Sequence, residues 1–121
     1  MKEMAKKMIT ECKTKSGASD ADLEMLTKKK VPESHEGLCM LECLLDTSEI
    51  MDEGRFSKDG MTEGFKMLAG DDEAKAKNFE ELASTCDKEI GDGDKDKCVT
   101  AKLVMECIMK NAKFSVPQFS L

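Results

Sequence analysis

The sequence predicts an all-α domain built from six helices. Apolar residues recur every three or four positions along most of the 121 residues, and strand-like alternation is nowhere evident. With 40% hydrophobic residues, a chain of this length is the size of one domain. Six cysteines at this density favour a disulfide framework in an oxidising compartment. We therefore expect a single disulfide-knitted domain over residues 1–121.

The first three helices are predicted from apolar spacing and from capping residues. The first ends near the segment KSGAS. Ser19 and Asp20 can cap a short second helix, which must end by Pro32 because proline lacks an N–H. The third is expected from about 36 to 51, with Gly54 as its stop, and its first half is apolar on nearly every side. We expect it to lie centrally.

The last three helices are bounded by similar signals. A fourth opens at Ser57 or Asp59 and closes at Gly70. A fifth begins at residues 71–72 and keeps helical spacing until the segment GDGD breaks it. A sixth, from roughly 94 to 112, is apolar around most of its circumference. An apolar tail, residues 113–121, follows it and contains Pro117.

Helix geometry limits which cysteines can pair. Cys39 and Cys43 lie on one face of the third helix, one turn apart, so each can meet a different neighbouring helix. Cys98 and Cys107 are about 13 Å apart along the sixth helix, beyond the roughly 7 Å that a disulfide spans. Excluding these two pairs leaves 10 of the 15 connectivities open.

Metal, redox and catalytic chemistry find little support. His35, Cys39 and Cys43 have the spacing H-x3-C-x3-C, but Gly37 and the preceding VPES argue against a helix through His35. A redox pair usually has the spacing C-x-x-C. The stretch DGDKDKCVTAKL starts like a calcium loop but lacks its glycine and its final glutamate. With one histidine and no catalytic motif, we expect neither an enzyme nor a bound metal or cofactor.

Charge and hydropathy restrict the partners and the location. The net charge of −6 argues against a nucleic-acid partner, which needs clustered Lys and Arg. No stretch reaches the roughly 18 apolar residues of a membrane span. The N-terminal residues do not resemble a signal peptide, so the chain is either cytosolic or numbered after signal removal. The six cysteines favour the second interpretation, a secreted protein.

The cysteine spacing resembles that of a known family. It reads C-x26-C-x3-C-x42-C-x11-C-x8-C from Cys12 to Cys107, and it resembles the six-cysteine pattern of insect odorant-binding proteins, the pheromone and general odorant-binding family. The resemblance covers essentially the whole chain. It implies a compact six-helix fold around an apolar cavity, with the disulfides Cys12–Cys43, Cys39–Cys98 and Cys86–Cys107.

The resemblance also implies a set of residues that line the cavity. They are apolar, come from all parts of the chain except the second helix, and include three residues of the tail, which would form part of the wall or its lid. The set consists of Met8, Leu45, Ile50, Phe56, Met61, Phe65, Leu68, Phe79, Leu82, Val104, Ile108, Phe114, Val116 and Phe119. Because a pocket wall and an ordinary core share the same chemistry, each of these residues could instead be packing.

The absence of Trp and Tyr leaves few polar groups for a ligand with a polar head. Such a head could meet Thr47, Thr62, Thr100, Ser115 or backbone groups, and none stands out. The ten methionines would give the cavity flexible, polarizable walls, which suit apolar guests of variable shape.

Together with these observations, the family resemblance implies a secreted carrier of odorants or pheromones. Its partners would be a small hydrophobic volatile or lipid-like ligand and, indirectly, a membrane receptor. We expect a monomer or weak homodimer in sensillum lymph or another secreted fluid. The alternative is a secreted disulfide-rich protein that acts through a protein–protein surface. It predicts a filled core and an exposed apolar patch, whereas a carrier has a cavity and no large patch.

Overall fold

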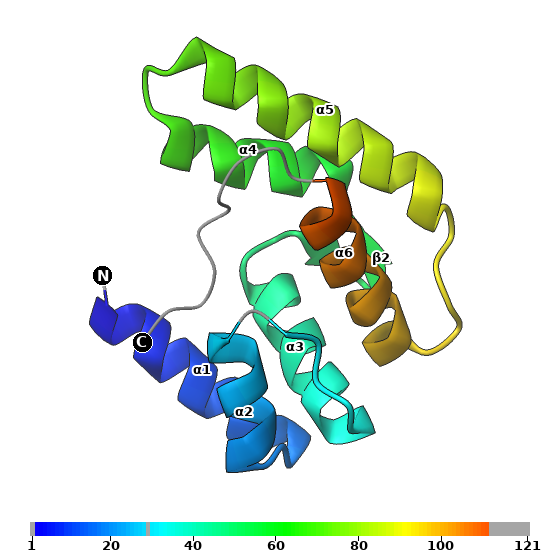
Figure 1. Ribbon diagram of the computed structural model, residues 1–121. Helices are drawn as coiled ribbons and strands as arrows, with labels where there is room; N and C mark the ends of the chain where they lie inside the picture. Colours follow the sequence, from blue (N-terminus) through cyan, green and yellow to red (C-terminus); the bar gives the residue numbers. More distant parts are fainter. Residues whose placement is uncertain (1, 29, 112–121) are drawn as a thin grey trace.

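The computed structural model describes residues 2–28 and 30–111, without the side chains of residues 2–5 and 65–69. Its elements confirm the all-α, six-helix prediction and are shown in Figure 1. In chain order they are α1 (Lys2–Ser16), α2 (Asp20–Thr27), α3 (His35–Thr47), β1 (Met51–Asp52), β2 (Arg55–Phe56), α4 (Lys58–Ala69), α5 (Glu73–Ile90) and α6 (Lys97–Asn111).

Helices α3 and α6 form the centre of the molecule, as their apolar circumferences predicted. α3 packs against both α6 and α1, and α5 packs against both α6 and α4. In Figure 1, α4 and α5 lie together on one side of this centre, while α1 and α2 lie on the other. Among the described residues, α4 packs extensively only against α5.

Most helix starts follow the predicted caps. The Ser19 hydroxyl accepts a hydrogen bond from Asp22 N–H, and the Asp22 carboxylate accepts one from Ser19 N–H, which makes a capping box. Ser34, which was not among the predicted caps, caps α3 by accepting a hydrogen bond from Gly37 N–H. The expectation that no helix runs through His35 was therefore wrong, because the Ser34 cap starts the helix one residue after the segment VPES.

The third helix is shorter than predicted, and a small hairpin follows it. α3 ends at Thr47, and residues 51–56 form two antiparallel strands in which Met51 pairs with Phe56. Glu53 and Gly54 make the turn, with φ angles of 52° and 81°. This is the positive-φ geometry that two-residue hairpins require. The expectation that the chain lacks strands was wrong here, because strands of two residues are too short to show a period.

Three disulfides link four of the six helices. Cys12–Cys43 joins α1 to α3, Cys39–Cys98 joins α3 to α6, and Cys86–Cys107 joins α5 to α6. This is the pairing that the family resemblance implied. In the described part of the chain, none of the helices has the length and apolar character needed to cross a membrane.

Candidate ligand-binding site

One continuous apolar cluster brings together predicted lining residues from four helices. Each of these six side chains is at most 5% exposed, and Met61 and Val104 are fully enclosed. The six are Leu45 of α3, Met61 of α4, Phe79 and Leu82 of α5, and Val104 and Ile108 of α6.

Helical spacing explains why these side chains converge. Phe79 and Leu82 lie three residues apart on α5, and Val104 and Ile108 lie four apart on α6, so each pair forms a stripe along one helix face. The Cys86–Cys107 disulfide joins α5 to α6 close to both stripes in the sequence and keeps the two helices adjacent. Met61 joins the same cluster from the N-terminal part of α4.

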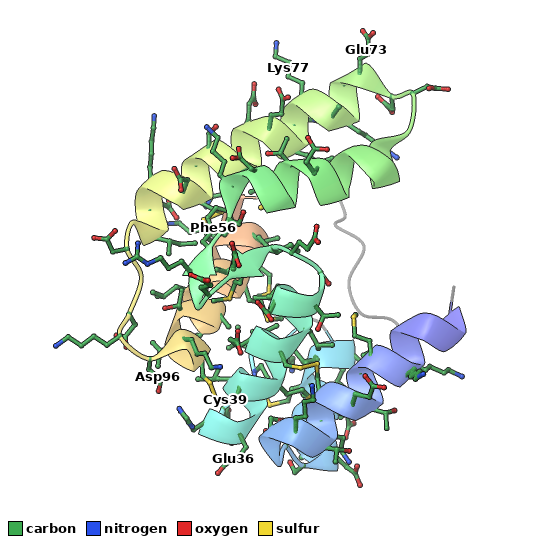
Figure 2. The ribbon with its side chains drawn as sticks, turned by 180° about the vertical axis from the view of Figure 1, so that it is seen from behind. Glu36, Cys39, Phe56, Glu73, Lys77 and Asp96 are labelled. Atoms are coloured by element: carbon green, nitrogen blue, oxygen red, sulfur yellow. A yellow bond between two sulfur atoms is a disulfide. The ribbon has the colours of Figure 1, made fainter. Side chains whose placement is uncertain are left out.

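Three further predicted residues are half-buried and pack against this cluster. Met8 comes from α1, Ile50 from the segment between α3 and β1, and Phe56 from β2. The Ser57 N–H donates a hydrogen bond to the Ile50 carbonyl at 2.8 Å, which closes the hairpin and holds Ile50 near Phe56. Figure 2 shows Phe56 on the hairpin, between the layer of α4 and α5 and the rest of the molecule.

The other predicted lining residues lie outside the described part of the site. The backbone of α4 includes Phe65 and Leu68, but their side chains are not described. The tail residues Phe114, Val116 and Phe119 lie beyond the described residues.

The cluster also contains apolar residues that are not among the lining residues implied by the family resemblance. Met40, Leu41 and Leu44 of α3 are at most 1% exposed, as is Met51 of β1. Helical spacing predicts the burial of the α3 residues. The signal for Met51 is the sequence MDEGRF, in which an E-G pair between two apolar residues marks a two-residue hairpin.

The three threonines expected as partners for a polar ligand head are already engaged, and the fourth candidate, Ser115, lies outside the described residues. Thr47 and Thr62 donate their hydroxyl hydrogens to the carbonyls of residues four positions earlier in their own helices. Thr100 donates to Asp94 O and accepts from Asp94 N–H. Among the described residues, every fully buried side-chain nitrogen or oxygen has a hydrogen-bond partner. The described side chains of the cluster therefore present an almost purely apolar surface.

Several hollows lined by described residues lie on the surface rather than in this cluster. The hollow between the hairpin turn and the segment before α6 is lined mostly by charged side chains, including Glu53, Arg55, Asp92 and Lys95. A second, on α5, is lined by Lys77, two glutamates and two hydroxyl residues. None of the predicted lining residues contributes to either of these hollows.

Comparison with known proteins identifies the family. The model of the PBP/GOBP family matches residues 1–111, which include all six cysteines and every helix described above. The chain belongs to the PBP/GOBP family. Two relatives of this PBP/GOBP chain are general odorant-binding proteins 19d and 28a of Drosophila melanogaster. Each is 32% identical, over 93% and 84% of this chain and 74% and 71% of their own lengths, respectively.

A solved structure of an odorant-binding protein has the same fold. The odorant-binding protein dmelOBP28a from Drosophila melanogaster superposes with a TM-score of 0.75 at 29% sequence identity. The match covers 90% of this chain and 89% of that protein. The family resemblance inferred from the cysteine spacing is therefore confirmed.

Proposed function

We propose that this PBP/GOBP protein is a secreted, non-enzymatic carrier. It encloses a small hydrophobic ligand, an odorant or a pheromone, in an internal apolar pocket and transports it through aqueous fluid. The observation that carries the proposal is the single buried cluster in which predicted lining residues from α3, α4, α5 and α6 meet. The two relatives are named as odorant-binding proteins, which supports the same role here.

Apolar burial can supply the required affinity. Burying each CH2 group of a guest is worth about 0.8 kcal/mol. A ligand of roughly eight to twelve carbons could therefore bind at micromolar affinity after the entropy cost of association. Contacts of this kind select for size and shape more than for one functional group, so a range of related volatiles should compete for the site.

Three disulfides support the proposed location in an oxidising, extracellular fluid. We also propose that the chain works as a monomer or weak homodimer and that a membrane receptor is reached only indirectly, by delivery of the ligand.

The tail residues Phe114, Val116 and Phe119 are proposed to complete the pocket wall or its lid. Deleting residues 113–121 should then weaken ligand binding, and unchanged affinity would refute this part of the proposal.

The alternative, a protein–protein surface, gains little from the described side chains. The exposed large apolar residues among them are Leu103 and Met109, with exposures of 37% and 43%. They are six positions apart on α6, which puts them about 120° apart around the helix. Two separated residues of this kind do not make the contiguous apolar patch that the alternative predicts.

Displacement of a fluorescent 1-aminonaphthalene probe from the oxidised protein tests the carrier proposal. We expect saturable micromolar binding at one site per chain, with displacement by C6 to C16 alcohols, aldehydes and esters. Met61→Ala should change probe affinity several-fold, because Met61 is enclosed in the cluster, whereas Met109→Ala at the exposed face of α6 should not. Absence of probe uptake by the folded protein would contradict the proposal and favour a filled core.

A further inference from the structure

The buried polar side chains of the described part of the chain already have partners within the protein. Each of them is at most 7% exposed, and they are Asp22, Glu42 and Thr100. The Asp22 carboxylate accepts hydrogen bonds at the start of its own helix. The Glu42 carboxylate lies 3.6 Å from Lys97 Nζ, and the Thr100 hydroxyl is bonded to the backbone of Asp94. Burial therefore marks none of the three as a free partner for a ligand.

The last turn of α3, which carries the predicted lining residue Leu45, uses its carbonyls within the chain. The last four carbonyls of a helix have no partner inside that helix. Here the carbonyls of residues 44, 45 and 46 accept hydrogen bonds of 2.9 to 3.0 Å from the N–H groups of Ser48, Ile50 and Glu49. Three of the four acceptors at this helix end are therefore occupied before any ligand binds.

The first turn of α4, which carries Met61, is satisfied in a similar way. The Ser57 hydroxyl accepts a hydrogen bond from Gly60 N–H at 3.0 Å, and the Ser57 carbonyl accepts one from Met61 N–H at 3.0 Å. Three more predicted lining residues lie inside α5 and α6, where the helical ladder pairs backbone N–H and C=O groups, namely Phe79, Leu82 and Val104.

The side chains of the cluster itself contribute only carbon and sulfur atoms to its surface. Four of its methionines are at most 3% exposed, namely Met40, Met51, Met61 and Met105. A thioether sulfur is a weak hydrogen-bond acceptor, but it is polarizable and makes favourable contacts with aromatic rings. Walls of this kind favour an aromatic or otherwise unsaturated hydrocarbon over a hydroxylated one.

We propose that the pocket selects ligands whose enclosed part has no hydrogen-bonding group. Aromatic and other unsaturated hydrocarbons then bind more tightly than alcohols or phenols of the same size. This inference rests on the proposed carrier function and names the ligand class of the same pocket. A hydroxyl that enters the cluster gives up its hydrogen bonds to water and meets groups that are already paired, which weakens binding by roughly a hundredfold. Longer alcohols still compete, because each added CH2 group recovers about fourfold in affinity.

Two ligands that differ only by a methyl and a hydroxyl group test this inference. p-Cymene and 4-isopropylphenol share the ring and the isopropyl group and have equal numbers of non-hydrogen atoms. Displacement of the 1-aminonaphthalene probe from the oxidised protein, in sealed vessels, gives the ratio of their affinities. We expect p-cymene to bind roughly a hundredfold more tightly. This affinity ratio should exceed the ratio of the two octanol–water partition coefficients, because octanol offers the hydroxyl a hydrogen-bond partner.

The outcomes distinguish this inference from the carrier function. An affinity ratio at or below the octanol–water ratio would overturn the inference and leave the carrier function standing. Failure of the probe and of both compounds to bind the folded protein would contradict the carrier function itself, and this inference with it.

Val104→Thr adds a hydroxyl to the cluster while keeping the shape of the side chain. In a helix this hydroxyl can donate to the carbonyl four residues earlier and still accept a hydrogen bond from a ligand. We therefore expect the affinity ratio to fall by roughly two- to tenfold. Val99→Thr, at a half-buried position of α6 outside the cluster, is the matched control and should leave the ratio unchanged. An unchanged ratio in folded Val104→Thr would show that the ligand hydroxyl does not meet this wall, against the inference.

The same assay tests the tail hydroxyl of Ser115, which lies outside the described residues. Ser115→Ala should leave the ratio of the two affinities unchanged. A larger ratio in this variant would show that the tail supplies a partner for the ligand hydroxyl, and the inference would then be wrong.

Discussion

Thr100 is a fully buried residue whose hydroxyl attaches the segment between α5 and α6 to the first turn of α6. The hydroxyl accepts a hydrogen bond from Asp94 N–H at 2.9 Å and donates to Asp94 O at 3.1 Å. Gly93 lies so close that an added Cβ would be 2.8 Å from the Thr100 side chain. Its φ of 73° also favours glycine. A single side chain thus fixes the path by which the chain enters its central helix.

Replacing Thr100 by valine keeps the shape of the side chain but removes both hydrogen bonds. We expect Thr100→Val to lower the free energy of unfolding by about 1–3 kcal/mol, because a part-buried N–H loses its partner. Urea denaturation of the oxidised protein measures this loss. Thr85→Val, at an exposed position of α5, is the matched control and should stay within about 0.5 kcal/mol of the unmodified chain. Equal stability of the two variants would contradict the role assigned to Thr100.

At the scale of single elements, α4 contains two glycines in opposite environments. A Cβ at Gly60 would clash with the backbone carbonyl of Glu49, because the segment after α3 crosses the first turn of α4 there. Gly64, one turn later, has open space around the position of its Cβ. The first glycine is needed for a close approach of two backbones, and the second is not.

Alanine at these two positions should therefore have opposite effects on stability. We expect Gly60→Ala to destabilise the protein by about 1–3 kcal/mol through overpacking. Gly64→Ala should instead stabilise it by up to about 1 kcal/mol, because alanine favours the helix. Thermal unfolding followed by circular dichroism gives both values in one experiment. Shifts of the same sign would show that helix propensity, rather than the contact with Glu49, decides the outcome.

The start of α2 makes the stability of this helix depend on pH. Burial alone would raise the pKa of Asp22, but hydrogen bonds from Ser19 N–H and from the Ser34 and Ser19 hydroxyls outweigh it, so the pKa lies below its ordinary value. A carboxylate with a lowered pKa stabilises the folded state above its unfolded pKa of about 4. This contribution is lost as the pH falls through the folded-state pKa.

Asp22→Asn should remove this contribution. At neutral pH the variant should be less stable than the unmodified chain by about 1 kcal/mol, the usual value of a helix cap. The difference should shrink as the pH is lowered below about 4, because the native carboxyl then becomes protonated as well. Denaturant titrations between neutral and acidic pH test this, with Asp46→Asn at an exposed position of α3 as the control. A difference that stays constant with pH would refute the role of the charge.

The sequence predicted the helices well and their junctions poorly. Ser19 and Pro32 gave the bounds of α2 to within a few residues, because capping and proline act locally. The end of α3 was missed because apolar residues continue through Met51, and Gly54 was interpreted as the stop of that helix rather than as part of a hairpin turn. The pairing of His35 with Asp96 was also unpredictable, since 61 residues separate them.

For the whole molecule, the disulfides divide the helices into two groups. Bridges join α1, α3, α6 and α5 in a single covalent series, whereas α2 and α4 carry no cysteine. α2 approaches α3 closely at Gly37, where an added Cβ would lie 2.9 Å from the Asp22 side chain. Within the described part of the chain, α4 packs mainly against α5. We infer that α4 can open without separating any of the disulfide-bonded helices.

Hydrogen exchange tests this difference. We expect backbone amides of α4 to exchange faster than those of α3 and α6, on the order of tenfold or more, because α4 opens without separating any bridged pair. The amides of α6 in the same sample are the internal control. Equal protection of the amides of α4 and α6 in the free protein would contradict the inference that α4 opens independently of the disulfide-bonded helices.

The sequence predicted that the candidate site is apolar, but it did not predict whether its residues line a pocket or fill a core. Apolar spacing identified Phe79, Leu82, Val104 and Ile108 as members of one interior, because helical periodicity directly selects buried faces. It could not separate a pocket wall from a filled core, since both use the same side chains. The two-residue hairpin that places Met51 and Phe56 against this interior had no periodic signal at all.

The order of the three bridges along the chain also determines what a protease can release. Each of the spans 12–43, 39–98 and 86–107 overlaps the next, so a single cut of the backbone anywhere from residue 12 to residue 107 leaves both fragments covalently joined. Two cuts are needed to free a piece, and the longest stretch without a cysteine, residues 44–85, carries the hairpin and α4. A nicked molecule should therefore migrate as one chain on a non-reducing gel and separate only after reduction. In a fluid that contains proteases, the molecule can be cleaved once and still remain one particle.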